Sequence, residues 1–185
     1  GDVACCFVND KINRGVIDGL QKRGIQLIAL RSAGYNHVDC AYAKEKGIRV
    51  CRVPAYSPHA VAEHAVALML SLNRKIPRAH NRVKEGDFSL TGLMGFDLYQ
   101  KTVGIIGTGQ IGYVLANILK GFGCNVLAYD ILQNKNCMKL GVQYVDLPEL
   151  LASSRIISLH CPLNQETQYI INEKTLAQMQ DGVML

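Results

Sequence analysis

Three glycines and one acidic residue carry the clearest chemical signal in this chain. The glycines form the pattern Gly107-x-Gly109-x-x-Gly112 directly after the apolar run 103–106, and Asp130 ends the next apolar run. In such a pattern the first glycine permits a tight turn, the second lets a phosphate approach the backbone, and the third allows a helix to pack closely on a strand. The free N–H groups at a helix start attract phosphate. The sequence therefore predicts a dinucleotide site, against the alternative of a glycine turn that only packs.

The acidic residue also bears on which dinucleotide is bound. A carboxylate at this point of a βαβ unit accepts hydrogen bonds from a ribose 2′-OH and repels a 2′-phosphate. Ile131 and Leu132 follow it and supply no arginine for such a phosphate, and Lys135 is the one nearby cation. We therefore predict NAD as the cofactor in preference to NADP.

A second glycine turn lies in the first third of the chain. The segment 31–36 contains Ala33 and Gly34 and follows an apolar run, and ligands of open α/β sheets bind at this carboxyl edge. Backbone N–H groups of such a turn can hold a carboxylate, although an ordinary loop explains the spacing equally well. Tyr56 follows the third apolar run on the same edge, where its hydroxyl can face a substrate or its ring can simply pack.

No histidine belongs to a recognisable catalytic or metal-binding pattern. His59 and Glu63 stand on one predicted helix, but the HExxH pattern of zinc sites is absent and the helix is otherwise apolar, so we predict no metal site. His160 ends an apolar run beside Cys161 and Pro162. Because no carboxylate partner is evident to orient it, we expect it on the wall of the cofactor site and not as a catalytic base.

Strands and helices alternate along the first third of the chain. Apolar runs at 3–8, 25–30 and 48–53 are separated by helical patterns over 11–23 and 37–46. This order predicts a parallel sheet with right-handed crossovers, whose carboxyl edge positions the second glycine turn.

A long apolar helix is predicted next, from Pro58 to about Arg74, with Ser57 as its N-cap. Its apolar positions cover more than one face, so we expect a helix buried on more than one side, as at an interface between domains or subunits. These positions are Val61, Ala62, Ala65, Val66, Leu68, Met69 and Leu72. A shorter helix restarts at Pro77 and runs to about Gly86.

The second half of the chain repeats the alternation around the glycine motif. The predicted strands cover 103–106, 125–129, 142–145 and 156–160, and the predicted helices cover 110–122, 148–153 and 172–179.

The fold class predicted from these patterns is α/β, with two open parallel-sheet units. We expect a flavodoxin-like substrate half-domain over 1–56, interdomain helices and a linker over 57–99, and a Rossmann NAD-binding domain over 100–185. Both sheet units are expected to be truncated, because the chain enters a strand at once and 182–185 reads as the opening of another.

Composition excludes several other classes. No apolar run reaches the roughly 18 residues of a membrane span, so no membrane partner is expected. Seven cysteines without CxxC spacing favour reduced thiols in a cytoplasmic protein. The net charge is +5, and the basic residues include one cluster without interleaved aromatic residues. Such a cluster favours a solvated helical face over nucleic-acid binding. The cluster comprises Arg74, Lys75, Arg78, Arg82 and Lys84.

Taken together, the motifs resemble those of the D-isomer-specific 2-hydroxyacid dehydrogenases over essentially the whole chain. The matching stretches are RSAGYNHVD at 31–39, VPAYSPHAVAEHAVALML at 53–70, NRKIPRAHNRVKEGDFSLTGL at 73–93, KTVGIIGTGQIG at 101–112 and ISLHCPLNQETQYIIN at 157–172. Two positions depart from the family pattern, since Gln100 stands where the family has glycine and Arg155 where it has an acid. We interpret both as structural drift.

The resemblance implies a two-domain fold with its active site in the cleft and a homodimer built around the cofactor domain. It implies that the backbone amides of Ala33 and Gly34 hold the substrate carboxylate, with Tyr56 beside them. The NAD contacts that it implies beyond the glycines come from Gln110, Ile111, Asp130, Cys161, Pro162 and Thr167, with His160 on the same wall.

The resemblance further implies reversible hydride transfer between NADH and a small 2-oxoacid, giving a D-2-hydroxyacid, with pyruvate and D-lactate as the expected pair. The family's catalytic arginine, glutamate and histidine would lie beyond Leu185, so we predict no catalytic residue within this chain and no activity from these residues alone. Two alternatives stay open: a sister dehydrogenase acting on another oxoacid, and an NAD-sensing, corepressor-like binding protein on the same scaffold.

Overall fold

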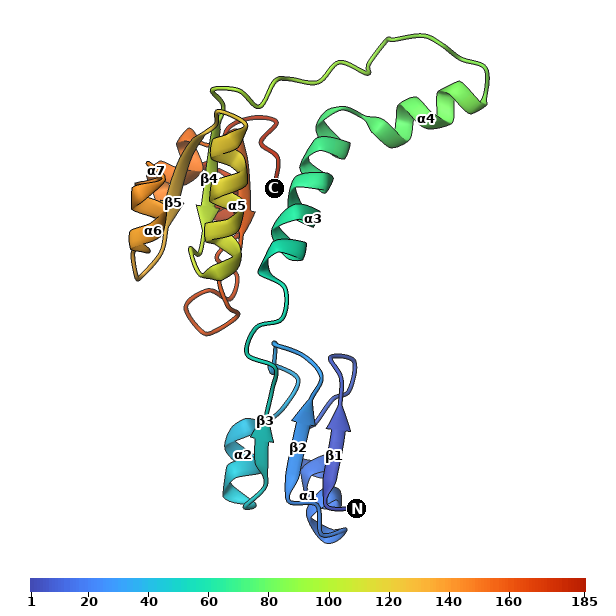
Figure 1. The fold of residues 1–185 in the computed structure, drawn as a ribbon, viewed down its shortest axis with the longest axis vertical. Coiled ribbons are helices and arrows are strands. Elements are labelled where there is room, and N and C mark those ends of the chain that lie inside the picture. Colours follow the sequence, from blue (N-terminus) through green and yellow to red (C-terminus); the bar gives the residue numbers. More distant parts are fainter. The chain divides into compact units, whose positions relative to one another are not determined.

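Two compact units make up the chain. The computed structural model describes every residue from Gly1 to Leu185 and divides into Gly1–Ser57 and Pro58–Leu185 (Figure 1). Each unit contains one sheet, and every strand pair in both sheets is parallel. The predicted α/β class is confirmed. The functional division at residues 56 and 99 stays a prediction.

The first unit is a three-stranded sheet with two helices. Asn13 and Asp39 begin the helices, because their side chains accept hydrogen bonds from backbone N–H groups of the first turn. Ile17, Ile28 and Ala43 are fully buried in its core. Every element predicted here exists but is shorter than its sequence pattern. The sheet order is β1-β2-β3, and the elements are β1 (Val3–Cys6), α1 (Arg14–Lys22), β2 (Leu27–Leu30), α2 (Cys40–Glu45) and β3 (Arg49–Cys51).

The second unit is built on a four-stranded sheet with the order β6-β5-β4-β7. The strand before the glycine motif, β4, is therefore central, and β5 and β7 pair with it on either side. The predicted opening strand at the chain end contributes one isolated bridge, from Met184 to Ile156. The strands are β4 (Thr102–Ile106), β5 (Asn125–Tyr129), β6 (Gln143–Tyr144) and β7 (Ile156–Leu159).

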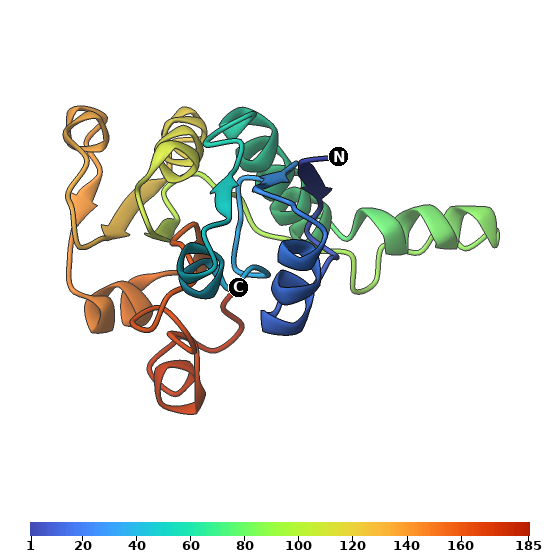
Figure 2. The same cartoon turned by 90° about the horizontal axis from the view of Figure 1, so that it is seen from below.

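Helices cover both faces of this sheet, with α5 and α7 on opposite faces in both views (Figures 1 and 2). The alternation of β4 agrees, since Val103 and Ile105 pack in the cluster of α5 and Ile106 packs in that of α7. The helix α6 was not predicted, and α8 is shorter than the expected 172–179. The helices are α5 (Gln110–Gly121), α6 (Lys135–Lys139), α7 (Leu147–Ser153) and α8 (Glu173–Leu176).

The long helix α3 (Pro58–Asn73) begins at the predicted proline but is buried along one face only. That face contains Ala62, Val66 and Met69, which pack in the cluster of α5. Within this unit Leu68 and Leu72 are 57% and 56% exposed, so the expected burial of a second side at an interface stays a prediction. Neither α3 nor any other helix combines the length and apolar character needed to cross a membrane.

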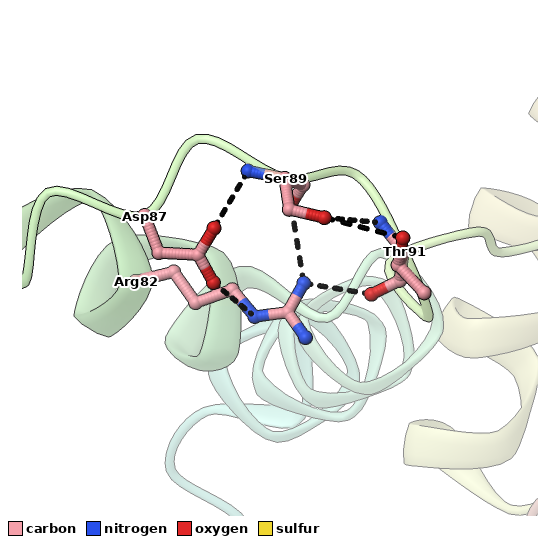
Figure 3. Close-up of polar contacts among 4 residues, drawn as sticks. All are labelled: Arg82, Asp87, Ser89 and Thr91. Carbon is pink, nitrogen blue, oxygen red and sulfur yellow. Dashed lines mark hydrogen bonds and ion pairs between the residues drawn. The ribbon is translucent and has the colours of Figure 1, made fainter.

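The helix α4 (Ile76–Lys84) has no buried residue. One of its arginines, Arg82, binds the segment that follows the helix. The Arg82 guanidinium donates to the carbonyl oxygens of Ser89 at 3.1 Å and Thr91 at 2.7 Å, and lies 3.6 Å from the Asp87 carboxylate (Figure 3). The Asp87 carboxylate also accepts from the backbone N–H of Ser89. These contacts fix residues 87–91 against α4 although no strand or helix forms there.

Candidate functional site

The glycine motif forms a tight turn between β4 and α5. Gly107 has φ +95°, a left-handed value that favours glycine, and its N–H donates to the carbonyl of Tyr129. A Cβ on Gly112 would collide with the carbonyl oxygen of Gly107, so this glycine lets the helix approach the strand. Gly109 is the N-cap of α5 and supplies no side-chain cap, and a Cβ there would meet nothing within 4 Å.

The helix start is therefore open to a ligand. The first N–H of α5 that bonds back into the helix is that of Tyr113, which donates to the Gly109 carbonyl. The preceding N–H groups of Gln110, Ile111 and Gly112 carry the positive end of the helix dipole into this space. This arrangement has the chemistry of an anion site.

Asp130 lies directly across from the glycine turn. Its Oδ2 accepts from the backbone N–H of Thr108 at 2.5 Å and from the Thr108 hydroxyl at 2.9 Å, and its Oδ1 accepts from the N–H of Leu132 at 3.1 Å. Burial alone would raise the pKa of this carboxyl, but the backbone hydrogen bonds from Thr108 and Leu132 outweigh burial and hold the pKa below its ordinary value. The side chain is consequently an anion near neutral pH.

A cavity of about 200 Å³ joins these elements at the carboxyl edge of the sheet. Most of the predicted cofactor residues line it, whereas Gln110, Ile111 and Gly112 stand beside it in the first turn of α5. Sequence reasoning missed several lining residues, because nothing in their local pattern distinguishes them from loop and core positions. The lining comprises Ile106, Gly107, Gly109, Tyr129, Asp130, Ile131, His160, Cys161, Pro162, Asn164, Glu166, Thr167 and Ile170.

One wall of the cavity is a loop held by Asn164 and Thr167. The Asn164 side-chain oxygen accepts from the N–H of Thr167 at 2.8 Å and from the N–H of Glu166 at 2.9 Å. The Thr167 hydroxyl donates to the Pro162 carbonyl and accepts from the N–H of Asn164. These local bonds give residues 162–167 a fixed shape without helix or strand.

His160 and Cys161 stand on this wall in their neutral forms. Burial lowers the pKa of His160, and its Nε2 lies 2.9 Å from the Ser158 hydroxyl with no carboxylate partner. Burial also raises the pKa of the Cys161 thiol. Both side chains line the cavity, and their role as wall residues of the cofactor site stays a prediction.

The second predicted turn lies after β2 in the first unit. The Ser32 hydroxyl donates to the Gly34 carbonyl at 2.7 Å, and the Arg52 guanidinium donates to the Ala33 carbonyl at 2.9 Å. The carbonyl groups of Ala33 and Gly34 are thus held by side chains of this unit. Tyr56 is 71% exposed, so its ring does not pack within this unit.

No group of three or more histidine, cysteine, aspartate or glutamate side chains is arranged to hold a metal ion. His59 and Glu63 belong to no such group.

Comparisons with known proteins identify the family. Residues 66–185 match the model of the D-isomer specific 2-hydroxyacid dehydrogenase, NAD binding domain. The chain is 52% identical over 184 residues to the D-lactate dehydrogenase of Escherichia coli, covering 100% of this chain and 56% of that relative. It is 53% identical over 184 residues to a 2-hydroxyacid dehydrogenase homolog of Haemophilus influenzae, again over 100% of this chain and 56% of that relative.

Solved structures agree with this assignment. The crystal structure of D-lactate dehydrogenase from Aquifex aeolicus complexed with NAD and lactic acid matches with a TM-score of 0.93 and 39% identity, covering 99% of this chain and 55% of that one. The apo-structure of the Escherichia coli enzyme matches with a TM-score of 0.89 and 52% identity, covering 99% of this chain and 58% of that one. The chain thus spans about half the length of the relatives that it matches. It belongs to the D-isomer-specific 2-hydroxyacid dehydrogenase family, and NAD is the cofactor of its second unit.

Proposed function

We propose that the full-length protein is an NAD-dependent oxidoreductase that interconverts a 2-oxoacid and a D-2-hydroxyacid, with pyruvate and D-lactate as its physiological pair. The observation that carries the proposal is the open glycine turn with Asp130 facing it, in a chain 52% identical to a D-lactate dehydrogenase. The match to an enzyme complexed with NAD and lactic acid supports the same substrate class.

The cofactor residues follow from the shape of the turn. NAD fits this turn because the space before the start of α5 is one that a Cβ on residue 109 would enter. In the proposal Gly107, Gly109 and Gly112 admit the pyrophosphate, and the N–H groups of Gln110 and Ile111 donate to it. When bound, the nicotinamide supplies or accepts the hydride.

The remaining cofactor residues hold the other parts of the dinucleotide. Asp130 accepts a hydrogen bond from the ribose as an anion, which disfavours a 2′-phosphate at the same place. His160, Cys161, Pro162 and Thr167 form the wall and exclude water, and the neutral His160 brings no unpaired charge into the cavity.

Substrate binding is assigned to the first unit. The backbone N–H groups of Ala33 and Gly34 hold the carboxylate of the oxoacid, and the exposed hydroxyl of Tyr56 contacts the substrate. The bonds from Arg52 to the Ala33 carbonyl and from Ser32 to the Gly34 carbonyl hold the turn in a fixed shape, in which its N–H groups would meet the anion.

A second copy of the chain is the proposed protein partner. Within the second unit, α3, α4 and the segment after α4 expose large apolar side chains, and exposed apolar surface of this kind is typical of an interface. Arg82 fixes that segment in one shape, as an interface requires (Figure 3). The exposed residues are Val61, Leu68, Leu72, Ile76, Val83, Phe88, Leu90 and Met94.

The free state of all seven cysteines supports a cytoplasmic location.

The test is a substrate panel with the full-length protein. NADH oxidation is followed at about 340 nm with pyruvate and with bulkier and acidic 2-oxoacids, and NADPH is compared at the same concentrations. The proposal expects the largest kcat/KM with pyruvate and NADH, with D-lactate and not L-lactate as product. Binding of NADH without turnover of any oxoacid would contradict an enzyme and favour a sensing protein, and a larger kcat/KM with a bulkier oxoacid would contradict the choice of pyruvate.

A further inference from the structure

A chain of hydrogen bonds leads from a backbone N–H to the carboxylate of Asp130. The N–H of Asn134 donates to the Tyr144 hydroxyl at 2.8 Å, and that hydroxyl donates to the Thr108 hydroxyl at 2.8 Å. The Thr108 hydroxyl donates in turn to Oδ2 of Asp130 at 2.9 Å. The chain brings together the glycine turn, the segment after β5 and the short strand β6.

The negative charge of Asp130 fixes which group donates and which accepts in every hydrogen bond of this series. An ionised carboxylate can only accept, so Thr108 must give it the single proton of its hydroxyl. Thr108 can then only accept from Tyr144, whose single proton is thereby used, and the phenol oxygen accepts the N–H of Asn134. No member can reverse its bond without leaving a neighbour unpaired. Such a directional chain strengthens each of its bonds and ends on the anion.

The surroundings hold this arrangement in place. Thr108 is only 2% exposed, and its carbonyl accepts from the side-chain amide of Asn134 at 2.8 Å. Tyr144 pairs with Ala128 in the register of β5 and β6, and the buried Cys137 is a further neighbour of its hydroxyl. A change of the Tyr144 side chain to another χ1 rotamer would move its hydroxyl and break both of these bonds at once, so the hydroxyl is held in one position.

The two oxygens of Asp130 consequently differ. Oδ2 is occupied by two donors from Thr108, its N–H and its hydroxyl. Oδ1 accepts the longer bond from the N–H of Leu132, and the backbone N–H of Ile131 is a further donor near the carboxylate. The Thr108 side of the carboxylate is therefore the more tightly held, and Oδ1 is the oxygen better able to accept from a ligand.

We propose that Tyr144 is a positioning residue for cofactor selection, whose hydroxyl acts through Thr108 to hold the Asp130 carboxylate so that NAD is preferred to its 2′-phosphorylated form. This inference rests on the proposed role of Asp130 at the ribose and adds to it a residue that does not line the cavity. The hydrogen bonds from Tyr144 to Thr108 and from Thr108 to Asp130 keep the carboxylate from rotating away when a 2′-phosphate approaches. The phosphate is therefore repelled by a negative charge in a fixed position.

The experiment is a double-mutant cycle of Tyr144→Phe and Asp130→Ala in the full-length protein. The dissociation constants of NADH and NADPH are measured by calorimetry for all four proteins. Tyr144→Phe is expected to weaken NADH binding about three- to tenfold, the effect of one lost hydrogen bond, and to change NADPH binding less than twofold. The preference for NADH over NADPH narrows accordingly. In the Asp130→Ala background the same substitution has no further effect, because the group through which it acts is gone.

A residue that only stabilises the fold would behave differently. Equal losses for NADH and NADPH, or a loss that persists in the Asp130→Ala background, would overturn the proposal and leave Tyr144 as a structural residue of β6. Failure of the unsubstituted protein to bind either nucleotide would overturn the proposed function itself. The two failures are therefore distinguishable.

Matched variants keep the test decisive. Tyr42→Phe removes a phenol hydroxyl that donates to Asp18 at 3.0 Å in the other unit, and it leaves both dissociation constants unchanged. Thr108→Val removes the middle hydroxyl of the chain at nearly constant volume and reproduces the pattern of Tyr144→Phe. Circular dichroism establishes that each variant is folded, and if Tyr144→Phe does not fold, the cycle with Thr108→Val decides by the same criterion.

Discussion

The guanidinium of Arg52 donates to the carbonyl oxygen of Ala33 at 2.9 Å, and the peptide unit that carries this carbonyl also carries the N–H of Gly34. In a trans peptide the N–H points opposite to the C=O, so the Gly34 N–H is directed away from Arg52. The charged donor on the carbonyl polarises the whole unit and makes this N–H a stronger donor. The guanidinium also lies 5.3 Å from the ring of Tyr35, which helps to fix it.

Arg52 is therefore expected to support substrate binding without touching the substrate. Arg52→Gln should raise the KM for pyruvate about fivefold, the equivalent of about 1 kcal/mol, while kcat and the NADH dissociation constant change less than twofold. Arg52→Lys should recover part of the loss. Steady-state kinetics on the full-length protein measure this split, with Arg49→Gln, an exposed arginine of β3, as the control. A KM unchanged in Arg52→Gln would separate this arginine from the carboxylate turn.

His160 gives the folded protein a defined pH dependence. Burial lowers its pKa in the folded state below the ordinary value of 6.5, whereas the unfolded chain has the ordinary value. Below pH 6.5 the unfolded chain therefore binds a proton that the folded protein does not, so stability falls as pH is lowered and levels off only below the folded pKa. Above pH 6.5 this residue contributes no slope.

The corresponding variant is His160→Gln, which keeps a partner for the Ser158 hydroxyl and cannot titrate. Urea unfolding between about pH 8 and pH 5 should show a smaller loss of stability on acidification than the unsubstituted protein shows. His80→Gln, at an exposed position of α4, is the matched exchange against which the His160 variant is compared. If the His160→Gln variant lost stability with falling pH as steeply as the unsubstituted protein, proton uptake by His160 would not occur in this pH range.

The accuracy of the sequence predictions follows the strength of each local pattern. The strand β5 is predicted to the residue, Asn125–Tyr129, because its apolar run is bounded by Asp130 and the helix stop before it. The helix α6 was missed because Lys135–Lys139 is too short to show a period, and only the cap from Asn134 marks its start. In α3 the stripe of apolar residues was recognised, but composition does not say which face packs on α5 and which stays exposed.

Site prediction shows the same limit. The glycine turn and Asp130 belong to one local motif and could be placed from the sequence. The contact of Tyr144 with Thr108 joins residues 36 positions apart, and only the pairing of β6 with β5 brings them together. The wall residues Asn164 and Glu166 likewise depend on how the loop after β7 folds back.

Gln100 shows that an apparent drift in sequence can have a conformational effect. Its φ is +60°, in the left-handed region that favours glycine, the residue that the resemblance leads us to expect at this position. The strained residue is held by bonds from its N–H to the Gly123 carbonyl and from the Asn125 amide to its own carbonyl. Gln100→Gly should therefore stabilise the second unit by about 0.5–1 kcal/mol, the relief of strain less the entropy of glycine.

Thermal unfolding measures this gain as an increase in Tm. The control is Gln143→Gly, which introduces the same change into the extended strand β6 and should lower Tm. A decrease in Tm for both variants would contradict the prediction. It would mean that the Gln100 side chain adds more to the stability of the fold than its left-handed backbone conformation removes.

The exposed face of α3 leads to the last prediction, on the proposed homodimer. Leu68 and Leu72 lie one turn apart and are 57% and 56% exposed, while the opposite face of the helix packs on α5. Burying two leucines between copies stabilises association by about 1.5–3 kcal/mol each, and a charge at either position would have to be buried without a partner. Leu72→Glu should therefore convert a dimer into a monomer at micromolar concentration, as measured by sedimentation equilibrium. Met138→Glu, at a 52% exposed position of α6, should leave the dimer intact. A dimer that survives both Leu68→Glu and Leu72→Glu would place the interface on another face of the molecule.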